Sequence, residues 1–414
     1  MTVHIIGAGL AGLAAAVNLT RAGLRVVVYE RAGHGGGRCR SFLSPALGRA
    51  LDNGNHLMLS GNDQAMAYVE TIGASETLWR APRAAFSFAD LATGRRWSIR
   101  PGRGRLPWWL LDKNRRVPGS TVAQHLAALK LLSASPGATV ADCFDTDGAL
   151  YRLFVEPLAI AVLNTDPQEG AASLLVPVLK QTLGRGAAAC LPCIPKQGLS
   201  ETLVDPALEF IRAGGNEIRF QARVKNFSFR GDRLAGFQVD DQMIALADDD
   251  RVIVATPPDG AVELIPDLVV PRQYRAIVNA HFVLQEPVRE PGFLGLINGF
   301  SQWVFVRHDM ASVTISAATD LVERATEDIA LLLWPEVCQA LDLPEAPLPP
   351  YSIIKEKRAT IAQTPVQERL RPGTVTKWRN LYLAGDWTAT GLPATIEGAI
   401  LSGNGAARSV LGAA

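Results

Sequence analysis

The first thirty residues alternate between apolar runs and glycine-rich breaks in a pattern that predicts four elements in succession. Residues 3–6 are a short apolar run, and a glycine-rich turn follows over residues 7–12. Small and apolar residues then continue without a strand breaker to Gly23, which is typical of a helix that ends on a glycine cap. Residues 24–29 are a second run, rich in β-branched side chains, that ends at Glu30. The pattern predicts a strand, a turn, a helix and a second strand followed by an acid.

This order is that of a dinucleotide-binding unit. Gly7 permits the tight turn, Gly9 lets the backbone approach a pyrophosphate, and Gly12 lets the helix pack close to the strand. The pyrophosphate then lies at the N-terminus of the helix. Glu30 follows Gly12 by 18 residues, where its carboxylate can accept both ribose hydroxyls. The alternative is a tight glycine turn that holds no ligand.

A second glycine cluster indicates which dinucleotide binds. Residues 31–38 contain four glycines and end in Arg38, where an ordinary NAD domain would continue into a helix. A flexible backbone with an arginine suits a second approach to phosphate and ring, as an extended FAD requires. Near the C-terminus, the apolar residues 380–384 predict a strand that stops at a glycine and Asp386. Asp386 can hold the ribityl chain, and the proline-led helix predicted over 391–399 presents positive partial charge to the flavin N1/O2 edge. By itself, Asp386 also fits a residue that caps a loop.

Composition narrows the class of protein. With 414 residues, the chain exceeds the size at which a single hydrophobic core stops growing, so we expect two or three domains. Apolar residues make up 48% and charged residues 20%, which excludes a disordered chain, a collagen and a coiled coil. The net charge of +1 gives no overall signature of nucleic-acid binding. We expect a globular enzyme.

The location of the protein is predicted from what the sequence does not contain. No stretch approaches the roughly 18 uninterrupted apolar residues of a membrane-spanning helix. The N-terminus has no basic region of a signal peptide, and five cysteines, an odd number, do not indicate a disulfide framework. We therefore expect a cytoplasmic protein with reduced thiols. The mean hydropathy of +0.12 is high for such a protein.

These motifs resemble those of the amine oxidase and phytoene desaturase superfamily of FAD-dependent oxidoreductases. More narrowly, the similarity is to the hydroxysqualene dehydroxylase family of bacterial hopanoid synthesis. It is dense over residues 3–62 and 381–407, and faint over much of the rest of the chain. The segments that carry it are 36–42 (GGRCRSF), 51–56 (LDNGNH), 383–388 (LAGDWT) and 390–399 (TGLPATIEGA).

The resemblance implies an α/β fold with a Rossmann-type FAD-binding domain, like that of amine oxidases and glutathione reductase, and a discontinuous α+β substrate domain. The FAD-binding domain would combine residues 1–60, 200–260 and 376–414, and the substrate domain residues 61–199 and 261–375. The residues that the motifs and the resemblance assign to FAD are Gly7, Gly9, Leu10, Ala11, Gly12, Glu30, Arg31, Gly36, Gly37, Arg38, Gly54, Asn55, His56, Val224, Gly385, Asp386, Ala394, Thr395 and Ile396.

The resemblance also implies an activity. In that family the substrate is hydroxysqualene, a long isoprenoid whose allylic hydroxyl is replaced by hydrogen to give squalene. Such a reaction needs a proton for the leaving oxygen, an apolar pocket that tolerates an allylic cation, and hydride from N5 of reduced flavin. The superfamily places the segment with Asp52, Asn55 and His56 against the flavin ring, so these are the candidate catalytic residues, with Asp52 or His56 as proton donor. A structural role for His56 is the alternative.

Electron supply and metal binding are predicted from missing motifs. No second glycine motif followed by an acid appears, and residues 292–295 carry two glycines at the wrong spacing. We therefore expect an external electron donor, either NAD(P)H or a redox protein. Cys190 and Cys193 form a single CxxC without a second pair, so two packed cysteines are expected and no metal is predicted.

A basic and aromatic segment suggests contact with a membrane. Trp108 and Trp109 lie at the centre of residues 100–116, a segment in which Asp112 is the single acid among six cationic side chains. Tryptophan beside cationic residues is how peripheral proteins rest on an anionic bilayer, here at the inner face of the membrane. A buried tryptophan pair with a solvated basic loop is the alternative. The cations are Arg100, Arg103, Arg105, Lys113, Arg115 and Arg116.

Two rival functions use the same fold. A carotenoid-type desaturase or an amine oxidase would pass electrons from its substrate to the flavin, and the sequence separates these activities poorly. A prenyl-lipid carrier, like the dissociation inhibitors of prenylated GTPases, would use no FAD and would have eroded flavin motifs. The glycines of the first turn, Glu30, Arg38 and Asp386 are all intact, which argues against the carrier.

Overall fold

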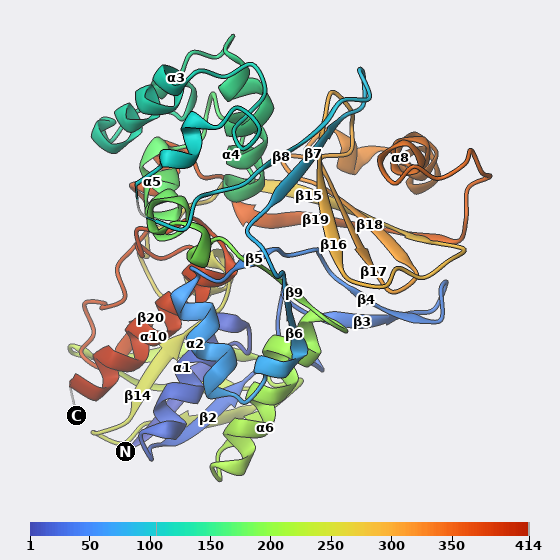
Figure 1. Cartoon of the computed structure of the whole chain (residues 1–414). Coiled ribbons are helices and arrows are strands. Elements are labelled where there is room, and N and C mark those ends of the chain that lie inside the picture. The colour runs from blue at the N-terminus through green and yellow to red at the C-terminus, as the bar shows by residue number, and fades with distance from the viewer. Residues whose placement is uncertain (105, 413–414) are drawn as a thin grey trace.

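The computed structural model describes residues 1–104 and 106–412, and a five-stranded parallel sheet organises one half of it (Figure 1). Strands from three distant parts of the chain form this sheet, because β2 pairs with β10, β1 pairs with β2 and β14, and β14 pairs with β20. In sheet order the strands are β10 (Glu217–Arg219), β2 (Arg25–Tyr29), β1 (Thr2–Ile6), β14 (Arg251–Val254) and β20 (Leu381–Leu383).

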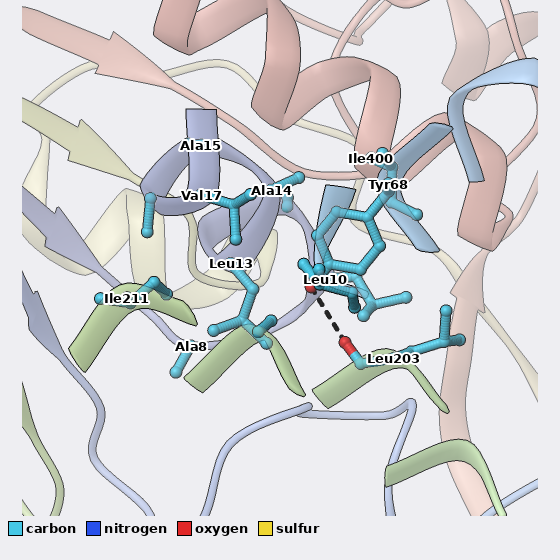
Figure 2. Packing of buried hydrophobic residues seen from close by; sticks show 14 of the residues in the cluster. Ala8, Leu10, Leu13, Ala14, Ala15, Val17, Tyr68, Leu203, Ile211 and Ile400 are labelled. Carbon is cyan, nitrogen blue, oxygen red and sulfur yellow. Dashed lines mark hydrogen bonds between the residues drawn. The ribbon is translucent and has the colours of Figure 1, made fainter. Parts of the chain in front are cut away.

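Helix α1 (Leu10–Arg21) is the most buried helix of this half, since nine of its residues are buried. Figure 2 shows Leu13, Ala14 and Val17 among side chains from its neighbours, with the Tyr68 hydroxyl donating to the Leu203 carbonyl at 2.9 Å. Its small residues permit close helix packing, which is the reason for its alanine-rich sequence. The helices that share this core are α2 (Asp63–Thr71), α6 (Asp205–Ala213), which continues the turn η8 (Ser200–Val204), and α10 (Ile396–Gly412).

The opposite side of the parallel sheet is covered by a small antiparallel sheet and a helix. Leu234 and Phe237 of the small sheet are fully buried against Val252 and Val254 of β14. Buried and partly buried positions largely alternate along its central strand, as one covered face of a sheet requires. The elements are β11 (Val224–Arg230), β12 (Arg233–Val239), β13 (Gln242–Ala245) and α7 (Pro258–Leu264).

A seven-stranded mixed sheet forms the second half, and apolar side chains cover both of its faces. One face packs on α8 (Thr326–Ala340), and part of the other packs on a lobe of short helices, which Figure 1 shows at the top. In sheet order the strands are β19 (Tyr351–Ile361), β15 (Tyr274–Val283), β18 (Met310–Ile315), β17 (Trp303–Arg307), β16 (Gly292–Ile297), β7 (Phe86–Asp90) and β8 (Arg96–Ile99).

The helical lobe is built from one- to three-turn helices, and its core includes Leu163, Leu174 and Leu175. Its elements are η2 (Trp108–Leu111), α3 (Val122–Ala127), η3 (Ala128–Ser133), η4 (Ala141–Cys143), η5 (Tyr151–Val155), α4 (Glu156–Leu163) and α5 (Ala172–Gln181). Short strands and a helix join the two halves: β3 (Ser41–Ser44), β4 (Arg49–Asp52), β5 (Met58–Leu59), β6 (Leu78–Arg80), β9 (Pro192–Pro195) and α9 (Pro365–Glu368).

The parallel sheet draws on each of the three stretches expected for the FAD-binding domain, but one boundary is different. Helix α2, expected in the substrate domain, packs with α10, and its Ala65, Tyr68 and Val69 lie in the core around α1. The boundary expected at residue 60 is therefore too early. Glu397 holds the N-terminus of α2, because its carboxylate accepts hydrogen bonds from the amides of Gln64 and Ala65 at 3.0 and 2.8 Å. No local pattern marks that contact, because its partners are more than 330 residues apart.

Candidate FAD and active site

The glycine turn after β1 leaves open space beside the N-terminus of α1. A side chain at Gly9 would meet no atom within 4 Å, whereas a Cβ at Gly12 would lie 2.0 Å from the Gly7 carbonyl oxygen. Gly12 is therefore required for the close approach of helix and turn, and Gly9 for the space in front of it. Gly9 provides no side-chain cap for α1, so the first amides of the helix are left for a ligand.

The second glycine cluster lies directly against the first. The Gly36 amide donates to the Ala8 carbonyl at 2.7 Å, and Gly9 and Gly36 form a parallel bridge. Glu30 joins the two clusters, because its carboxylate accepts hydrogen bonds from the amides of Ala8 and Ala32, both at 2.8 Å. The structure thus brings the two motifs into one surface whose shape Glu30 helps to fix.

Arg38 and Asp386 meet although 348 residues separate them. The guanidinium donates to Asp386 Oδ1 at 2.7 Å and to the Ala359 carbonyl at 2.6 Å. Asp386 is buried at the end of β20, while the Arg38 side chain is about 41% exposed. A buried carboxylate paired with a half-exposed guanidinium provides one acceptor and one cation for the polar middle of a dinucleotide.

Arg371 holds the loop between β20 and α10, and sequence analysis missed it. This fully buried guanidinium donates to the carbonyls of Asp386, Thr388 and Leu392 at 3.0, 2.9 and 2.8 Å. Glu368 pairs with it at 2.8 Å. An arginine in a proline-rich stretch carries no recognisable signal, and only its burial reveals what it does.

Helix α10 begins at Ile396 and not at the proline that was expected to start it. Thr395 provides the cap, since its hydroxyl oxygen accepts from the Gly398 amide at 3.2 Å. The Ala394 amide donates to Gln363 at 2.7 Å, which ties this end of the helix to the substrate half. The N-terminus of α10 therefore stands at the junction of the two halves.

These features fit FAD. An open helix N-terminus, a carboxylate at the end of β2 and a carboxylate at the end of β20 are donors and acceptors of the kind that pyrophosphate, ribose and ribityl groups need. The arrangement does not extend to every residue assigned to the cofactor. Arg31 is exposed, and Val224 is the first residue of β11 with its backbone paired to Val239, so roles for both in FAD binding stay predictions.

A small, partly open pocket lies beside the segment 52–56. Asp52, Asn55 and His56 line it together with Phe305, Arg307 and His281, which sequence analysis did not single out. The cavity lies at the junction of β4, β9 and the seven-stranded sheet. Its remaining lining residues are Ala50, Leu51, Ile194, Pro195, Leu199, Val306, Met310 and Ser312.

Asp52 is fully engaged as a hydrogen-bond acceptor. Its Oδ1 accepts from the Ser41 hydroxyl at 2.6 Å and from the Leu199 amide at 2.8 Å. Its Oδ2 accepts from Arg307 at 2.9 Å. These three donors orient the carboxylate and connect the sheet to β4, which is the geometry of a positioning group.

His56 and Asn55 have polar atoms left for a ligand. The Nδ1 atom of His56 lies 3.0 Å from the Gly54 carbonyl, so it carries a proton and Nε2 has no partner among the described residues. Burial lowers the pKa of His56 from its ordinary value, against the opposing effect of that carbonyl. Asn55 donates to Thr314 at 3.0 Å, which fixes its amide and leaves its oxygen available.

The CxxC cysteines are buried and reduced. Cys190 and Cys193 are both free thiols, and burial raises the pKa of Cys190 to about 12. Thiols of that acidity are protonated at neutral pH and react poorly. The expectation of two packed cysteines is confirmed.

The two tryptophans of the basic and aromatic segment have different environments. Trp108 is 71% exposed, whereas Trp109 packs edge-on against His125 at 6.2 Å between ring centroids. The alternative of a buried tryptophan pair is therefore wrong for Trp108. Arg105 lies outside the described residues. Within residues 1–104 and 106–412, no helix has the length and apolar character needed to cross a membrane.

Exposed leucines extend this surface onto α3 and η3. We call the exposed apolar residues of η2, α3, η3 and the chain around them the apolar ridge. The contact between Trp109 of η2 and His125 of α3 joins the part of the ridge on η2 to the part on α3 and η3. Between residues 100 and 133, Asp112 is the sole acid in the sequence. The ridge consists of Leu106, Trp108, Leu111, Leu126, Leu129 and Leu132.

Comparisons with known proteins extend over nearly the whole chain. Residues 10–411 match the family model described as flavin containing amine oxidoreductase. The chain is 46% identical over 413 residues to a hydroxysqualene dehydroxylase from Rhodopseudomonas palustris, covering 100% of this chain and 99% of that protein. It is 43% identical to a hydroxysqualene dehydroxylase from Sinorhizobium fredii, covering 98% and 97%. A solved oxidoreductase from Methanosarcina mazei has a TM-score of 0.73 at 17% identity, covering 98% and 99%, which is a similarity of fold alone.

Proposed function

This chain belongs to the flavin-containing amine oxidoreductase family, and on that premise we propose that it is an FAD-dependent enzyme that removes the hydroxyl of hydroxysqualene to give squalene. The observation that carries the proposal is the full-length similarity, at 43–46% identity, to proteins named for this activity. The intact cofactor surface supports an enzyme and not a lipid carrier. The expected α/β flavoprotein fold is confirmed.

The chemistry replaces a C–O bond by a C–H bond and releases water, so it consumes one hydride and one proton. Reduced FAD, when bound, supplies the hydride. The chain must bind the alcohol in the cavity, deliver the proton to its oxygen and exclude water from the developing cation. We place the proton on His56 Nε2, because Asp52 accepts every hydrogen bond that it makes.

Aromatic side chains extend from the cavity along one face of the sheet. Phe305 lines the cavity, Phe293 lies 6.3 Å from it between ring centroids, and Phe86 lies 6.2 Å beyond Phe293. Aromatic faces attract cations and do not hydrate them. This row is suited to an isoprenoid chain that carries an allylic cation.

The proposal also includes membrane contact. The apolar ridge lies on the helical lobe, and exposed Arg103, Lys113 and Lys130 flank it. Large apolar side chains with cations on one surface suit an anionic bilayer, from which so apolar a substrate would be drawn. We place this contact at the inner face of the membrane.

An external donor is proposed to reduce the flavin. The described structure contains one βαβ unit with the glycine turn, formed by β1, α1 and β2, and Gly292 and Gly295 lie within strand β16. Transient binding of NAD(P)H or of a redox protein is then the remaining source of electrons.

Anaerobic incubation of the reduced holoenzyme with hydroxysqualene tests the function directly. We expect squalene in the extract and reoxidised flavin in the absorbance spectrum, in equal amounts. Intact hydroxysqualene with the flavin still reduced contradicts the proposal, and the oxidative activities, desaturation and amine oxidation, would then be assayed with oxidised enzyme.

A further inference from the structure

Gln363, just after the end of β19, joins the helical lobe to the start of α10. It is only 1% exposed. Its backbone amide donates to the Thr165 hydroxyl at 3.0 Å, and its carbonyl accepts from the Ala171 amide at 2.8 Å. Its side chain donates from Nε2 to the Leu163 carbonyl at 2.6 Å and accepts at Oε1 from the Ala394 amide at 2.7 Å. One buried residue therefore connects the substrate half to the cofactor half.

The two partners of its side chain fix the direction in which the Gln363 amide points. The Leu163 carbonyl can only accept and the Ala394 amide can only donate, so Nε2 faces the first and Oε1 the second. A side-chain amide supplies both a donor and an acceptor, which these two backbone groups need in a buried place. The chain just before α10 is thereby attached to the helical lobe through one oriented side chain.

The amides that follow Ala394 in the chain are unpaired. The Ala394 amide is occupied by Gln363 and the Gly398 amide by the Thr395 hydroxyl. Among the described residues, no hydrogen bond involves the backbone amides of Thr395 and Ile396. The first amides of a helix have no partner inside the helix and carry partial positive charge. Because each peptide group is a rigid plane, the direction of these two amides depends on where the Ala394 amide is held.

The sequence motifs assign the loop between β20 and α10 to the flavin end of FAD. Asp386 begins that loop and is paired with Arg38, which also donates to the Ala359 carbonyl of β19. Gln363, beyond the end of the same strand, holds the other end of the loop at Ala394. Reduction of a flavin places negative charge on its N1/O2 edge, and unpaired amides stabilise that charge more than they stabilise the neutral oxidised ring.

We propose that Gln363 is a positioning residue for the flavin: by holding the Ala394 amide, it directs the free amides of Thr395 and Ile396 toward the N1/O2 edge. It thereby increases the affinity of the protein for reduced FAD relative to oxidised FAD. The inference goes beyond the proposed function, because it concerns the cofactor and is the same for any substrate and for either direction of electron transfer. Gln363 acts through the backbone of α10 and takes no part in the chemistry itself.

The test measures the midpoint potential of the bound flavin, by anaerobic titration of the holoenzyme against a reference dye. Gln363→Met fills a similar space with a flexible apolar side chain and removes both the donor and the acceptor. We expect the dissociation constant of reduced FAD to rise about tenfold more than that of oxidised FAD, as for a weakened hydrogen bond to a charged group. The midpoint potential then falls by about 30 mV, the equivalent of a tenfold change in a two-electron couple.

Two further variants separate positioning from general loosening. Gln367→Met is the matched control, because the Gln367 side chain is also buried and accepts from the amides of Arg272 and Gln273 at 2.9 and 3.3 Å. None of its hydrogen bonds in the described structure reaches the loop before α10, so we expect the wild-type potential. Thr165→Val keeps the Gln363 side chain and removes the partner of its backbone amide, so a smaller shift in the same direction is expected even where Gln363→Met yields no holoenzyme.

Two results would overturn the inference. One is an unchanged potential in every variant of Gln363 and Thr165 that binds FAD, including the case in which both redox states lose affinity equally, because Gln363 would then only stabilise the loop. The other is an equal shift in Gln367→Met, which would make general loosening the cause. Neither result involves the turnover of hydroxysqualene, so the inference and the proposed function stand or fall separately.

Discussion

At the scale of single residues, side chains of the same type in the candidate site have different hydrogen-bond partners. Two imidazoles line one cavity, but the Gly54 carbonyl holds the proton of His56 on Nδ1 whereas Ser312 faces Nδ1 of His281. Two carboxylates, Asp52 and Asp386, are each paired with an arginine, and both serve to position a segment. The division of roles is set by neighbours that the sequence does not place.

The pH dependence of turnover tests His56 as the proposed proton donor. Burial lowers the pKa of His56 below its ordinary value, and its protonated fraction increases as the pH falls. With saturating reduced cofactor, we expect the single-turnover rate to rise as the pH falls from 8 to 6, by at most about tenfold per pH unit. His56→Gln should be slow and nearly independent of pH, with normal FAD content. An unchanged slope in this variant would assign the proton to another group.

At the scale of elements, η2, α3 and η3 present an apolar surface where short surface helices are ordinarily polar. Trp109 and His125 pack together and hold the two parts in place, and Trp108 and the leucines remain exposed. An exposed apolar patch of this kind marks an interaction site. The residue pattern indicated the segment, and burial decided which tryptophan is available.

Liposome co-sedimentation measures whether the apolar ridge contributes to membrane binding. With vesicles rich in phosphatidylglycerol, we expect Trp108→Ala/Leu111→Ala to reduce binding about tenfold or more, since burying one large apolar side chain contributes about 1.5–3 kcal/mol. Leu43→Ala/Val375→Ala is the control, because these two residues are equally exposed and lie outside the ridge. Equal loss in both double variants, or none in the first, would argue against docking through the ridge.

At the scale of the whole molecule, the cofactor surface is assembled from distant parts of the chain. Gly9, Gly36 and Asp386 come from three segments, and Arg38 and Glu30 hold those segments together. A ligand that contacts all of them stabilises the native state by its binding free energy. At free FAD a hundred times its dissociation constant, that amounts to about 2.7 kcal/mol.

Calorimetry of the apoprotein tests this assembly. Addition of FAD should raise the unfolding temperature by a few degrees, about 1 °C for each kcal/mol in a chain of 414 residues. FMN lacks the adenylate half and cannot reach the turn before α1, so we expect a clearly smaller shift at equal concentration. Equal stabilisation by FMN would mean that the glycine turns contribute little to binding.

The sequence by itself determined the cofactor-binding half. The first strand, helix and second strand, the glycine turns and the Gly-Asp strand end are local patterns, because backbone geometry at a glycine and periodicity in a helix depend on neighbouring residues. The boundary at residue 60 was wrong for the opposite reason, since α2 is placed by contacts with α10. FAD and the family followed from these motifs, and both are confirmed.

Only the tertiary structure decided which residues line the pocket proposed for catalysis. Arg371 and Arg307 acquire their contacts from burial and from partners up to 255 residues away, and neither stands in a local motif. Polar residues at alternate positions of β15 were the one available signal, and they are ambiguous because a solvated strand shows the same alternation. Chemistry that depends on desolvation and long-range pairing is therefore fixed by the fold, whereas the cofactor turn is fixed by its own residues.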